Sequence, residues 1–200
     1  RPMVTVDTVV FSFFDDALRV LLIRRGHEPF VGKWAIPGGF LDMDEPVEAA
    51  ARRELKEETG LEIKGTIEPF GFFGNPGRDP RGRTITLAHA AVIPGGHHEI
   101  KGGDDAAEAA WINVAEAVEL AFDHDQILAS ALSWLREGVV QGDLGLRLLP
   151  ATFETREARN LFGALGSSSI QARGWLRKRI RSGKILALPG SRFQVVDPAR

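Results

Sequence analysis

The chain has 200 residues, of which 44% are hydrophobic and 26% charged, and its formal net charge is −2. This length and composition are those of a globular protein with room for one medium domain and a small second one. The absence of cysteine excludes disulfides, a thiol nucleophile and a cysteine-ligated zinc site. No segment approaches the roughly 18 consecutive apolar residues of a membrane span, and the first residues alternate too strictly for a signal peptide, so we expect a cytoplasmic protein.

Strands dominate the first 110 residues. Four segments rich in Val, Ile, Thr and Phe are broken by Gly, Pro and Asp and predict strands at residues 4–14, 18–25, 66–74 and 84–93. One helix interrupts them over residues 46–59, because Pro46 suits its first turn and Gly60 suits the position just after its end. A second helix is predicted over residues 125–138 by apolar residues that recur on one side.

The pattern changes to helices from residue 152 onward. The predicted elements are helices at residues 155–166 and 167–183 and strands at residues 184–190 and 192–196. Helix, turn, helix and hairpin in this order is typical of a winged helix-turn-helix. Residues 141–150 form the predicted connection, so we divide the chain into residues 1–148 and residues 149–200.

Charge is distributed unevenly between these two parts. Residues 150–200 contain ten Lys and Arg against three acidic residues, a formal charge of +7. The remaining residues contain 15 basic against 24 acidic residues, a formal charge of −9. This asymmetry predicts two functions, and the basic part is the candidate for a polyanionic partner.

Three glutamates crowd the helix predicted over residues 46–59. Glu54, Glu57 and Glu58 are spaced i, i+3 and i+4. Their carboxylates therefore leave one face of the helix, opposite the apolar stripe that includes Leu55, and repel each other. Taken alone, the three glutamates favour a solvated acidic face balanced by neighbouring Arg and Lys. A hard cation such as Mg²⁺ or Mn²⁺ among the carboxylates explains the same crowding.

The residues around the glutamates favour the metal interpretation. They match the pattern G-x5-E-x7-R-E-U-x-E-E-x-G-U, where U is aliphatic, at every position. The matching residues are Gly39, Glu45, Arg53, Glu54, Leu55, Glu57, Glu58, Gly60 and Leu61. A chance match in a chain of this length has a probability on the order of 10⁻⁶. The segment resembles the Nudix box, and residues 4–140 resemble Nudix hydrolases, which implies an α/β/α sandwich with a mixed sheet.

The Nudix resemblance implies a metal-dependent pyrophosphohydrolase. Hydrolysis of a pyrophosphate needs divalent cations that neutralise its oxygens and acidify a bound water. The ligands that the resemblance implies for Mg²⁺ or Mn²⁺ are the carbonyl of Gly39 and the carboxylates of Glu54, Glu57 and Glu58. By the same resemblance, Arg53 forms a salt bridge with Glu45 that holds the loop against the helix, although Arg53 is also spaced to pair with Glu57 on the helix itself.

The general base stays open between two regions of the sequence. It is either a glutamate of the box or an acidic residue of the later segment 97–111, which we expect to be a loop. The candidates there are Glu99, Asp104, Asp105 and Glu108. His124 precedes Asp125 at a helix start, where capping and packing are commoner than metal binding.

An arginine-rich loop predicts the substrate site. Arg78, Arg81 and Arg83 lie in a Gly/Pro loop at residues 74–86, where guanidiniums suit bidentate capture of phosphates and stacking on a base. A solvated surface loop explains their charge but not their clustering. Arg25 and Trp34 complete the predicted substrate site. The loop resembles that of ADP-ribose pyrophosphatases, which implies hydrolysis of ADP-ribose, or of a related nucleoside diphosphate derivative, to AMP and ribose 5-phosphate.

The second predicted helix of the C-terminal part has the layout of a recognition helix. Arg173, Arg177 and Arg181 form one stripe, beside an apolar stripe of Ala172, Leu176 and Ile180. Serines before the helix offer an N-cap. Lys178 and Arg192, the latter near the tip of the predicted wing, complete the candidate DNA-binding residues. The alternative is a basic helix that packs back on the acidic domain.

A Nudix domain followed by a winged helix resembles the Nudix-related transcriptional regulators of NAD metabolism. In those proteins the Nudix domain senses ADP-ribose and the winged helix binds operator DNA as a dimer. Their recognition helix commonly reads Asn-Phe-Arg-Arg-Lys where this chain has Gly-Trp-Leu-Arg-Lys at residues 174–178. We therefore expect a homodimeric ADP-ribose pyrophosphatase whose winged helix binds duplex DNA. The alternative is an ADP-ribose-sensing regulator with little or no turnover.

Overall fold

The computed structural model describes residues 1–95, 98–103 and 106–196. The elements are, in chain order, β1 (Met3–Phe14), β2 (Ala17–Arg25), β3 (Trp34–Ala35), β4 (Gly38–Phe40), α1 (Val47–Thr59), β5 (Glu68–Phe73), β6 (Thr84–Val92), β7 (Ala106–Asn113), α2 (His124–Val140), α3 (Leu144–Leu148), β8 (Thr152–Glu154), α4 (Thr155–Ala164), α5 (Ser169–Arg181), β9 (Ile185–Leu188) and β10 (Arg192–Val195). They form two compact units. The first comprises residues 1–11, 20–91 and 97–131, and the second comprises residues 12–19, 92–96 and 132–200.

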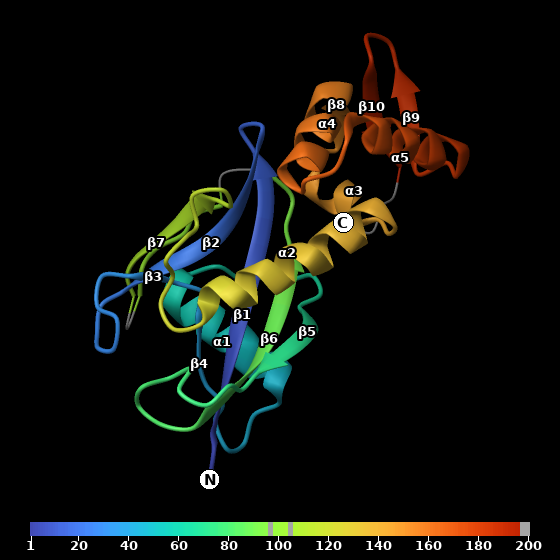
Figure 1. Cartoon of the computed structure of the whole chain (residues 1–200). Helices are drawn as coiled ribbons and strands as arrows, with labels where there is room; N and C mark the ends of the chain where they lie inside the picture. The colour runs from blue at the N-terminus through green and yellow to red at the C-terminus, as the bar shows by residue number, and fades with distance from the viewer. Residues whose placement is uncertain (96–97, 104–105, 197–200) are drawn as a thin grey trace. The chain divides into compact units, whose positions relative to one another are not determined.

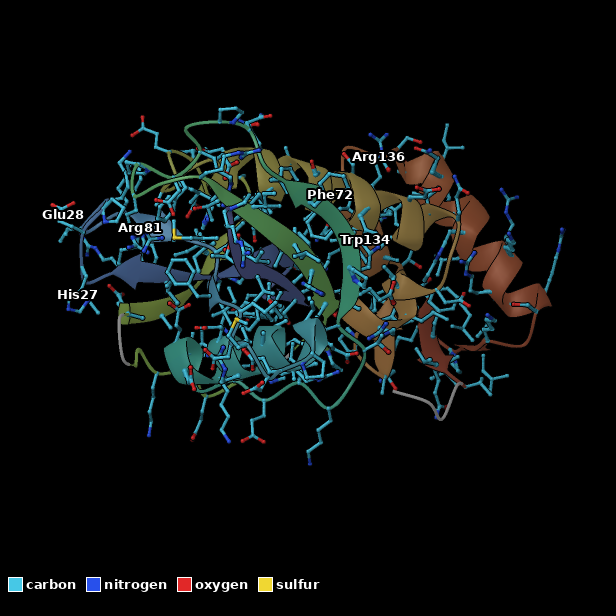
Figure 2. All side chains as sticks on the ribbon, turned by 90° about the horizontal axis from the view of Figure 1, so that it is seen from below. His27, Glu28, Phe72, Arg81, Trp134 and Arg136 are labelled. Carbon is cyan, nitrogen blue, oxygen red and sulfur yellow. The ribbon has the colours of Figure 1, made fainter. Side chains whose placement is uncertain are left out.

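A seven-stranded sheet with the order β3-β2-β1-β6-β5 forms the centre of the Nudix-like part, with β4 beside β1 and β7 beside β2. β1 and β6 begin side by side, since the N–H of Met3 donates to the carbonyl of Arg83 at 2.8 Å, so these neighbours are parallel. β3, β4 and β5 pair antiparallel with their neighbours. Figures 1 and 2 show α1 on one face of the sheet and the first half of α2 on the other. The predicted α/β/α sandwich with a mixed sheet is confirmed.

Helix α1 lies where its local sequence predicts it. Pro46 occupies the N-cap position, and Gly60 ends the helix in the left-handed conformation at φ 70°. The apolar side of the helix packs on the sheet, where Ala51 is buried in one cluster with Val6 and Ala91. This packing fixes α1 against β1 and β6. The backbone of the residues on this helix that match the Nudix box is therefore held in a defined position.

The strands that the sequence analysis missed have weak local patterns. β3 and β4 are two and three residues long, too short for any periodicity to be read. β7 is rich in alanine, a residue that is depleted in strands, and it begins within the segment 97–111 that we expected to be a loop. The expectation was wrong for Glu108, which lies on this strand.

The second unit contains the winged helix that the order of elements predicted. Its three-stranded antiparallel sheet has the order β8-β10-β9, and Phe153 of β8 pairs with Phe193 of β10. The helices α4 and α5 meet through Phe162 and Trp175, whose rings pack edge to face at 5.7 Å between centroids. Helix, helix and hairpin follow one another as in other winged helices, so this expectation is confirmed.

The connection predicted at residues 141–150 contains a short helix, α3. Leu146 and Leu148 of this helix are buried. Removing these apolar side chains from water stabilises the fold. A Cβ atom at Gly145 would lie 2.9 Å from the ring of Trp175, so the glycine lets α3 approach α5 closely. The boundary between a Nudix hydrolase domain at residues 1–148 and a winged-helix domain at residues 149–200 remains a prediction. Among the described residues, no helix has the length and apolar character needed to span a membrane.

Candidate functional site

A cavity of about 230 Å³ in the first unit is lined by both carboxylates and cations. Its walls include Gly39, Glu54 and Glu58 from the predicted metal site and Arg25, Arg78 and Arg81 from the predicted substrate site. In the sequence Arg25 precedes Gly39, whereas Arg78 and Arg81 follow α1 and β5. The fold brings them together because α1 and β4 face the loop that precedes β6.

Arg53 connects the acidic residues of the box. Its Nη2 lies 2.5 Å from Oε1 of Glu45 and 3.1 Å from the carbonyl oxygen of Phe40. Its Nη1 donates to Glu54 at 2.8 Å and to Glu57 at 3.0 Å. These hydrogen bonds hold the pKa of the Glu45 carboxyl below its usual range and raise the pKa of Arg53 further. The salt bridge implied by the Nudix resemblance is present and fixes the loop of Glu45 to α1.

The three glutamates of α1 occupy different environments. Glu58 is only 6% exposed, and its Oε2 accepts a hydrogen bond from the N–H of Gly38 at 2.9 Å. Burial raises the pKa of Glu58 to about 8, and burial also raises the pKa of Glu54. Glu57 is exposed. We expected all three carboxylates on the helix face opposite the apolar core. This expectation was wrong for Glu58, which is buried.

Gly39 brings the backbone of β4 against the glutamates. A Cβ atom at this position would lie 2.4 Å from the carboxylate of Glu54, so no other residue fits without displacing that side chain. Carboxylate and carbonyl oxygens are the donors that Mg²⁺ and Mn²⁺ prefer. In the described part of the chain, no three acidic or histidine side chains already stand in the arrangement of a metal site. Glu57 and Glu58 are instead engaged with Arg53 and the Gly38 N–H.

Arg78 is a buried member of an internal ion-pair network. Its side chain is 5% exposed, and its Nη2 and Nε donate to the carboxylate of Asp123 at 2.7 and 2.9 Å. The Nη2 atom also lies 3.7 Å from the carboxylate of Asp7. Because two carboxylates already neutralise this guanidinium, Arg78 shapes the wall of the cavity more than it offers a free positive charge.

Arg81 and Arg25 present their guanidiniums to aromatic rings at the cavity. The guanidinium carbon of Arg81 lies 5.2 Å from the ring centroid of Phe40 and 5.6 Å from that of Phe122. The guanidinium carbon of Arg25 lies 4.9 Å from the same Phe122 ring. Arg81 also pairs with the buried carboxylate of Asp79 at 2.8 Å. Figure 2 labels Arg81 on the loop that leads into β6.

Phe122 is a cavity residue that sequence reasoning missed. It has a left-handed backbone conformation with φ 56°, which is uncommon for a bulky residue, and so has Phe30 with φ 66°. The two rings meet edge to face with centroids 4.8 Å apart. The local sequence around Phe122 does not predict its place in the cavity. That place depends on contacts with residues far away in the sequence, such as Phe30.

Several predicted site residues lie elsewhere. Of the described residues, those that line the cavity do not include Arg83, Trp34 or Glu108, nor the box residues Glu45, Arg53 and Glu57. Arg83 donates to backbone carbonyls of its own loop, and the carbonyl of Trp34 accepts from the N–H of Ala121. Glu108 lies 3.8 Å from Arg24, and both side chains are half exposed. Asp105 and Asp104 lie outside the described residues.

His124 forms part of the buried wall beside Asp7. Its Nδ1 accepts a hydrogen bond from the N–H of Ile36 at 2.9 Å, and its Nε2 lies 3.6 Å from Oδ1 of Asp7. Burial lowers the pKa of His124, so the ring is neutral at physiological pH. It links the start of α2 to the segment between β3 and β4, which is the packing role that its sequence position indicated.

The predicted DNA-binding residues lie on the surface of the second unit. The exposed cations are Arg173, Arg177, Lys178 and Arg181 on α5 and Arg192 on β10. Helix α5 contains no acidic residue and begins with a capping box formed by Ser168 and Gln171. A surface that carries four exposed cations and no acid on one helix suits a polyanion.

The buried side of α5 differs from the predicted apolar stripe. Ile180 is exposed, and Arg179 is buried in its place. The guanidinium carbon of Arg179 lies 4.9 Å from the ring centroid of Trp175, and its Nη2 lies 3.3 Å from a carboxylate oxygen of Asp143. Arginine is rarely buried unless it is paired. The sequence pattern therefore predicted that Ile180, and not Arg179, would be buried.

Comparison with known proteins agrees with this architecture. The model of the NUDIX domain family matches residues 3–135, so the chain belongs to the Nudix family. The chain is 30% identical over 205 residues to the ADPR responsive transcriptional repressor NtrR of Acinetobacter baylyi, which covers 100% of this chain and 80% of that protein. It is 40% identical over 134 residues to the ADP-ribose pyrophosphatase of Methanocaldococcus jannaschii, covering 67% of this chain and 75% of that enzyme.

A solved structure resembles the chain over nearly its whole length. The crystal structure of Shewanella oneidensis NrtR complexed with a 27mer DNA matches with a TM-score of 0.75 at 26% sequence identity. The match covers 96% of this chain and 91% of that one. The relatives of this chain thus include both an ADP-ribose-cleaving enzyme and DNA-associated Nudix proteins.

Proposed function

We propose that the chain is a Mg²⁺- or Mn²⁺-dependent Nudix hydrolase that cleaves the pyrophosphate of ADP-ribose, or of a related nucleoside diphosphate derivative, to AMP and ribose 5-phosphate. The observation that carries this proposal is a complete Nudix box whose Glu54 and Glu58 share one cavity with Arg25 and Arg81. Carboxylates for a cation and guanidiniums for a phosphate are the two requirements of pyrophosphate chemistry.

Residues of the box would hold the cation. The proposed ligands are the carbonyl oxygen of Gly39 and the carboxylates of Glu54, Glu57 and Glu58. A bound divalent cation neutralises phosphate oxygens and lowers the pKa of a coordinated water. Arg53 acts as a positioning residue, because its hydrogen bonds hold the carboxylates of Glu54 and Glu57 in fixed orientations.

The other walls of the cavity would bind and orient the substrate. Arg81 and Arg25 offer charge to the two phosphates, while the rings of Phe40 and Phe122 give an apolar surface for a ribose or a base. The proton of the attacking water would pass to a glutamate of the box. Glu108 is less suited to that role, because it lies outside the cavity lining and faces Arg24.

The test is release of AMP from ADP-ribose with and without Mg²⁺. The Glu58→Gln variant keeps the size of the side chain but cannot ionise to bind a cation, so we expect a loss of about 100-fold or more in turnover. Glu62→Gln is the matched control, since Glu62 is 62% exposed and pairs only with Lys56 among the ion pairs of the described residues. Equal activity of the Glu58→Gln variant and the wild type would contradict the site assignment.

We also propose that the winged helix binds duplex DNA as part of a homodimer. The observation that favours this second function is the exposed cationic surface of α5 and β10. In this proposal ADP-ribose is the signal of a transcriptional regulator of NAD metabolism, and slow hydrolysis of the signal resets the regulator. A regulator that binds ADP-ribose with little or no turnover is the alternative. DNA affinity should fall with salt at about −0.9 in log–log slope per phosphate contact, and a flat dependence would contradict phosphate binding.

A further inference from the structure

The exposed face of α5 has a glycine at its centre. Ala172, Trp175, Leu176 and Arg179 are the buried residues of the helix. At 100° per residue, the direction opposite to them falls on Ile170, Gly174, Arg177 and Arg181. Gly174 is therefore the one position in the middle of this outward face that carries no side chain.

No contact among the described residues requires a glycine at this position. A Cβ atom built on Gly174 meets no atom of the described residues within 4 Å, so the fold has space for a larger residue. The backbone there has no left-handed φ that would favour glycine. A glycine in a helix interior also makes the helix less stable than an alanine would. The helical Gly163 of α4 is equally open, so what distinguishes Gly174 is its place among the exposed cations of α5, where a glycine lets a molecule from outside approach the backbone closely.

Ile170 borders the gap that Gly174 leaves. The two residues are four apart, so they are neighbours on one face, and a side chain at 174 would lean toward residue 170. Ile170 is 69% exposed and lies beside the cations Arg173 and Arg177. An apolar side chain at the floor of a cationic surface suits the one apolar group that the DNA major groove displays, the C5-methyl group of thymine.

We propose that Gly174 and Ile170 form a base-reading notch on α5, in which the absent side chain lets the major groove approach and Ile170 contacts a thymine methyl group. The inference rests on the proposed DNA binding of the winged helix. Arg173, Arg177 and Lys178 around the notch contact phosphates or neighbouring bases, so they supply affinity while the notch supplies sequence preference.

The first test uses Gly174→Ala in the full chain. With space for the methyl group, the variant should melt about 2–4 °C higher than wild type. The same methyl group should weaken binding at least about tenfold to a duplex that the wild-type chain selects from a random pool, because it fills the notch. Gly163→Ala is the matched control, since Gly163 is an exposed helical glycine of α4 with equal space. It should raise the melting temperature and leave DNA affinity unchanged.

The second test replaces each thymine of the selected duplex by deoxyuridine, which removes only the methyl group. One position should weaken wild-type binding roughly fourfold, the factor expected for burying one methyl group. The same replacement should have no effect on Ile170→Ser, whereas Val118→Ser, at a similarly exposed aliphatic residue, should respond like the wild type.

The outcomes separate the inference from the function on which it rests. Failure of the full chain to bind any duplex at low salt would overturn the proposed DNA binding and the notch with it. Tight duplex binding that Gly174→Ala retains, or that no uracil replacement weakens, would overturn the notch alone. The result that we expect is a variant that is more stable than wild type and binds its duplex more weakly.

Discussion

Arg53 and Glu45 form a two-point ion pair, with Nη2–Oε1 at 2.5 Å and Nε–Oε2 at 3.1 Å. The remaining amino group of Arg53 is directed to Glu54 and Glu57 on its own helix. One guanidinium thus joins the loop after β4 to the carboxylates of α1. This geometry makes Arg53 a positioning residue with two separable contributions, one to the loop and one to the glutamates.

Replacing Arg53 by lysine should test this positioning. Lysine keeps the charge but loses the planar fork, so it can serve Glu45 or the glutamates of α1 but not both. We expect about a 10- to 100-fold loss of ADP-ribose turnover and a destabilisation of about 1–2 kcal/mol. The measurement is steady-state kinetics together with urea unfolding. Arg52→Lys is the control for turnover, because Arg52 contacts Glu48 and the backbone carbonyls of Ile63 and Gly65, all outside the cavity lining.

Arg78 and Arg81 should respond differently to the same substitution. Arg78→Lys breaks a buried network with Asp123 and should cost about 3 kcal/mol of unfolding free energy. Arg81→Lys changes a half-exposed side chain, so it should raise the KM for ADP-ribose severalfold and leave stability within about 1 kcal/mol. Urea unfolding and kinetics of both variants measure this. Equal effects of the two substitutions on stability would contradict the assignment.

Phe122 should contribute to substrate binding through its ring. Phe122→Leu keeps apolar packing but removes the aromatic face that lies beside Arg25 and Arg81. We expect KM to rise about fivefold to tenfold with a smaller change in kcat. Phe72→Ala is the control, because this ring of β5 is 80% exposed and is labelled away from Arg81 in Figure 2. An unchanged KM in Phe122→Leu would remove Phe122 from the substrate site.

His124 should make stability depend on pH. Burial lowers the pKa of His124, and Arg78 and Arg25 lower it further, while Asp7 and Asp123 oppose the shift. The unfolded chain binds a proton near pH 6.5, whereas the folded chain does not. The contribution of neutral His124 to the free energy of unfolding is therefore fully present above about pH 6.5. It is lost as the pH falls, by up to about 1.4 kcal/mol per pH unit.

The measurement is urea unfolding of wild type and His124→Asn at pH 7.5 and pH 5.5. The difference in unfolding free energy between the two proteins should shrink at the lower pH, because the variant has no group to protonate. His89 is also buried with a lowered pKa and remains in both proteins, so its contribution cancels. A difference that does not change with pH would contradict a neutral, buried His124.

The parts of the molecule that local sequence predicts are those fixed by local physics. Pro46 and Gly60 mark the ends of α1 because capping depends on a few adjacent residues. The Nudix box was visible for the same reason, since its residues share one loop and one helix. The winged helix followed from the order of its elements, which the alternation of helical and extended patterns gives directly.

The parts that could not be predicted depend on contacts distant in sequence. Arg78 and Arg81 look alike in the loop sequence, and only Asp7 and Asp123 make the first of them a buried structural residue. Arg179 replaces Ile180 in the buried side of α5 because a carboxylate and an aromatic ring are available to it. Such partners are supplied by tertiary packing, so a residue pattern along one helix contains no information about them.

The most direct measurement of the central claim is the stoichiometry of ADP-ribose cleavage as Mg²⁺ is added to the full chain. A Nudix hydrolase with this site should release AMP and ribose 5-phosphate in equal amounts, only with the cation, and the Glu58→Gln variant should lose about 100-fold or more of that activity. ADP-ribose that binds tightly in the presence of Mg²⁺ and stays intact would contradict the hydrolase and leave the complete box as part of a sensor.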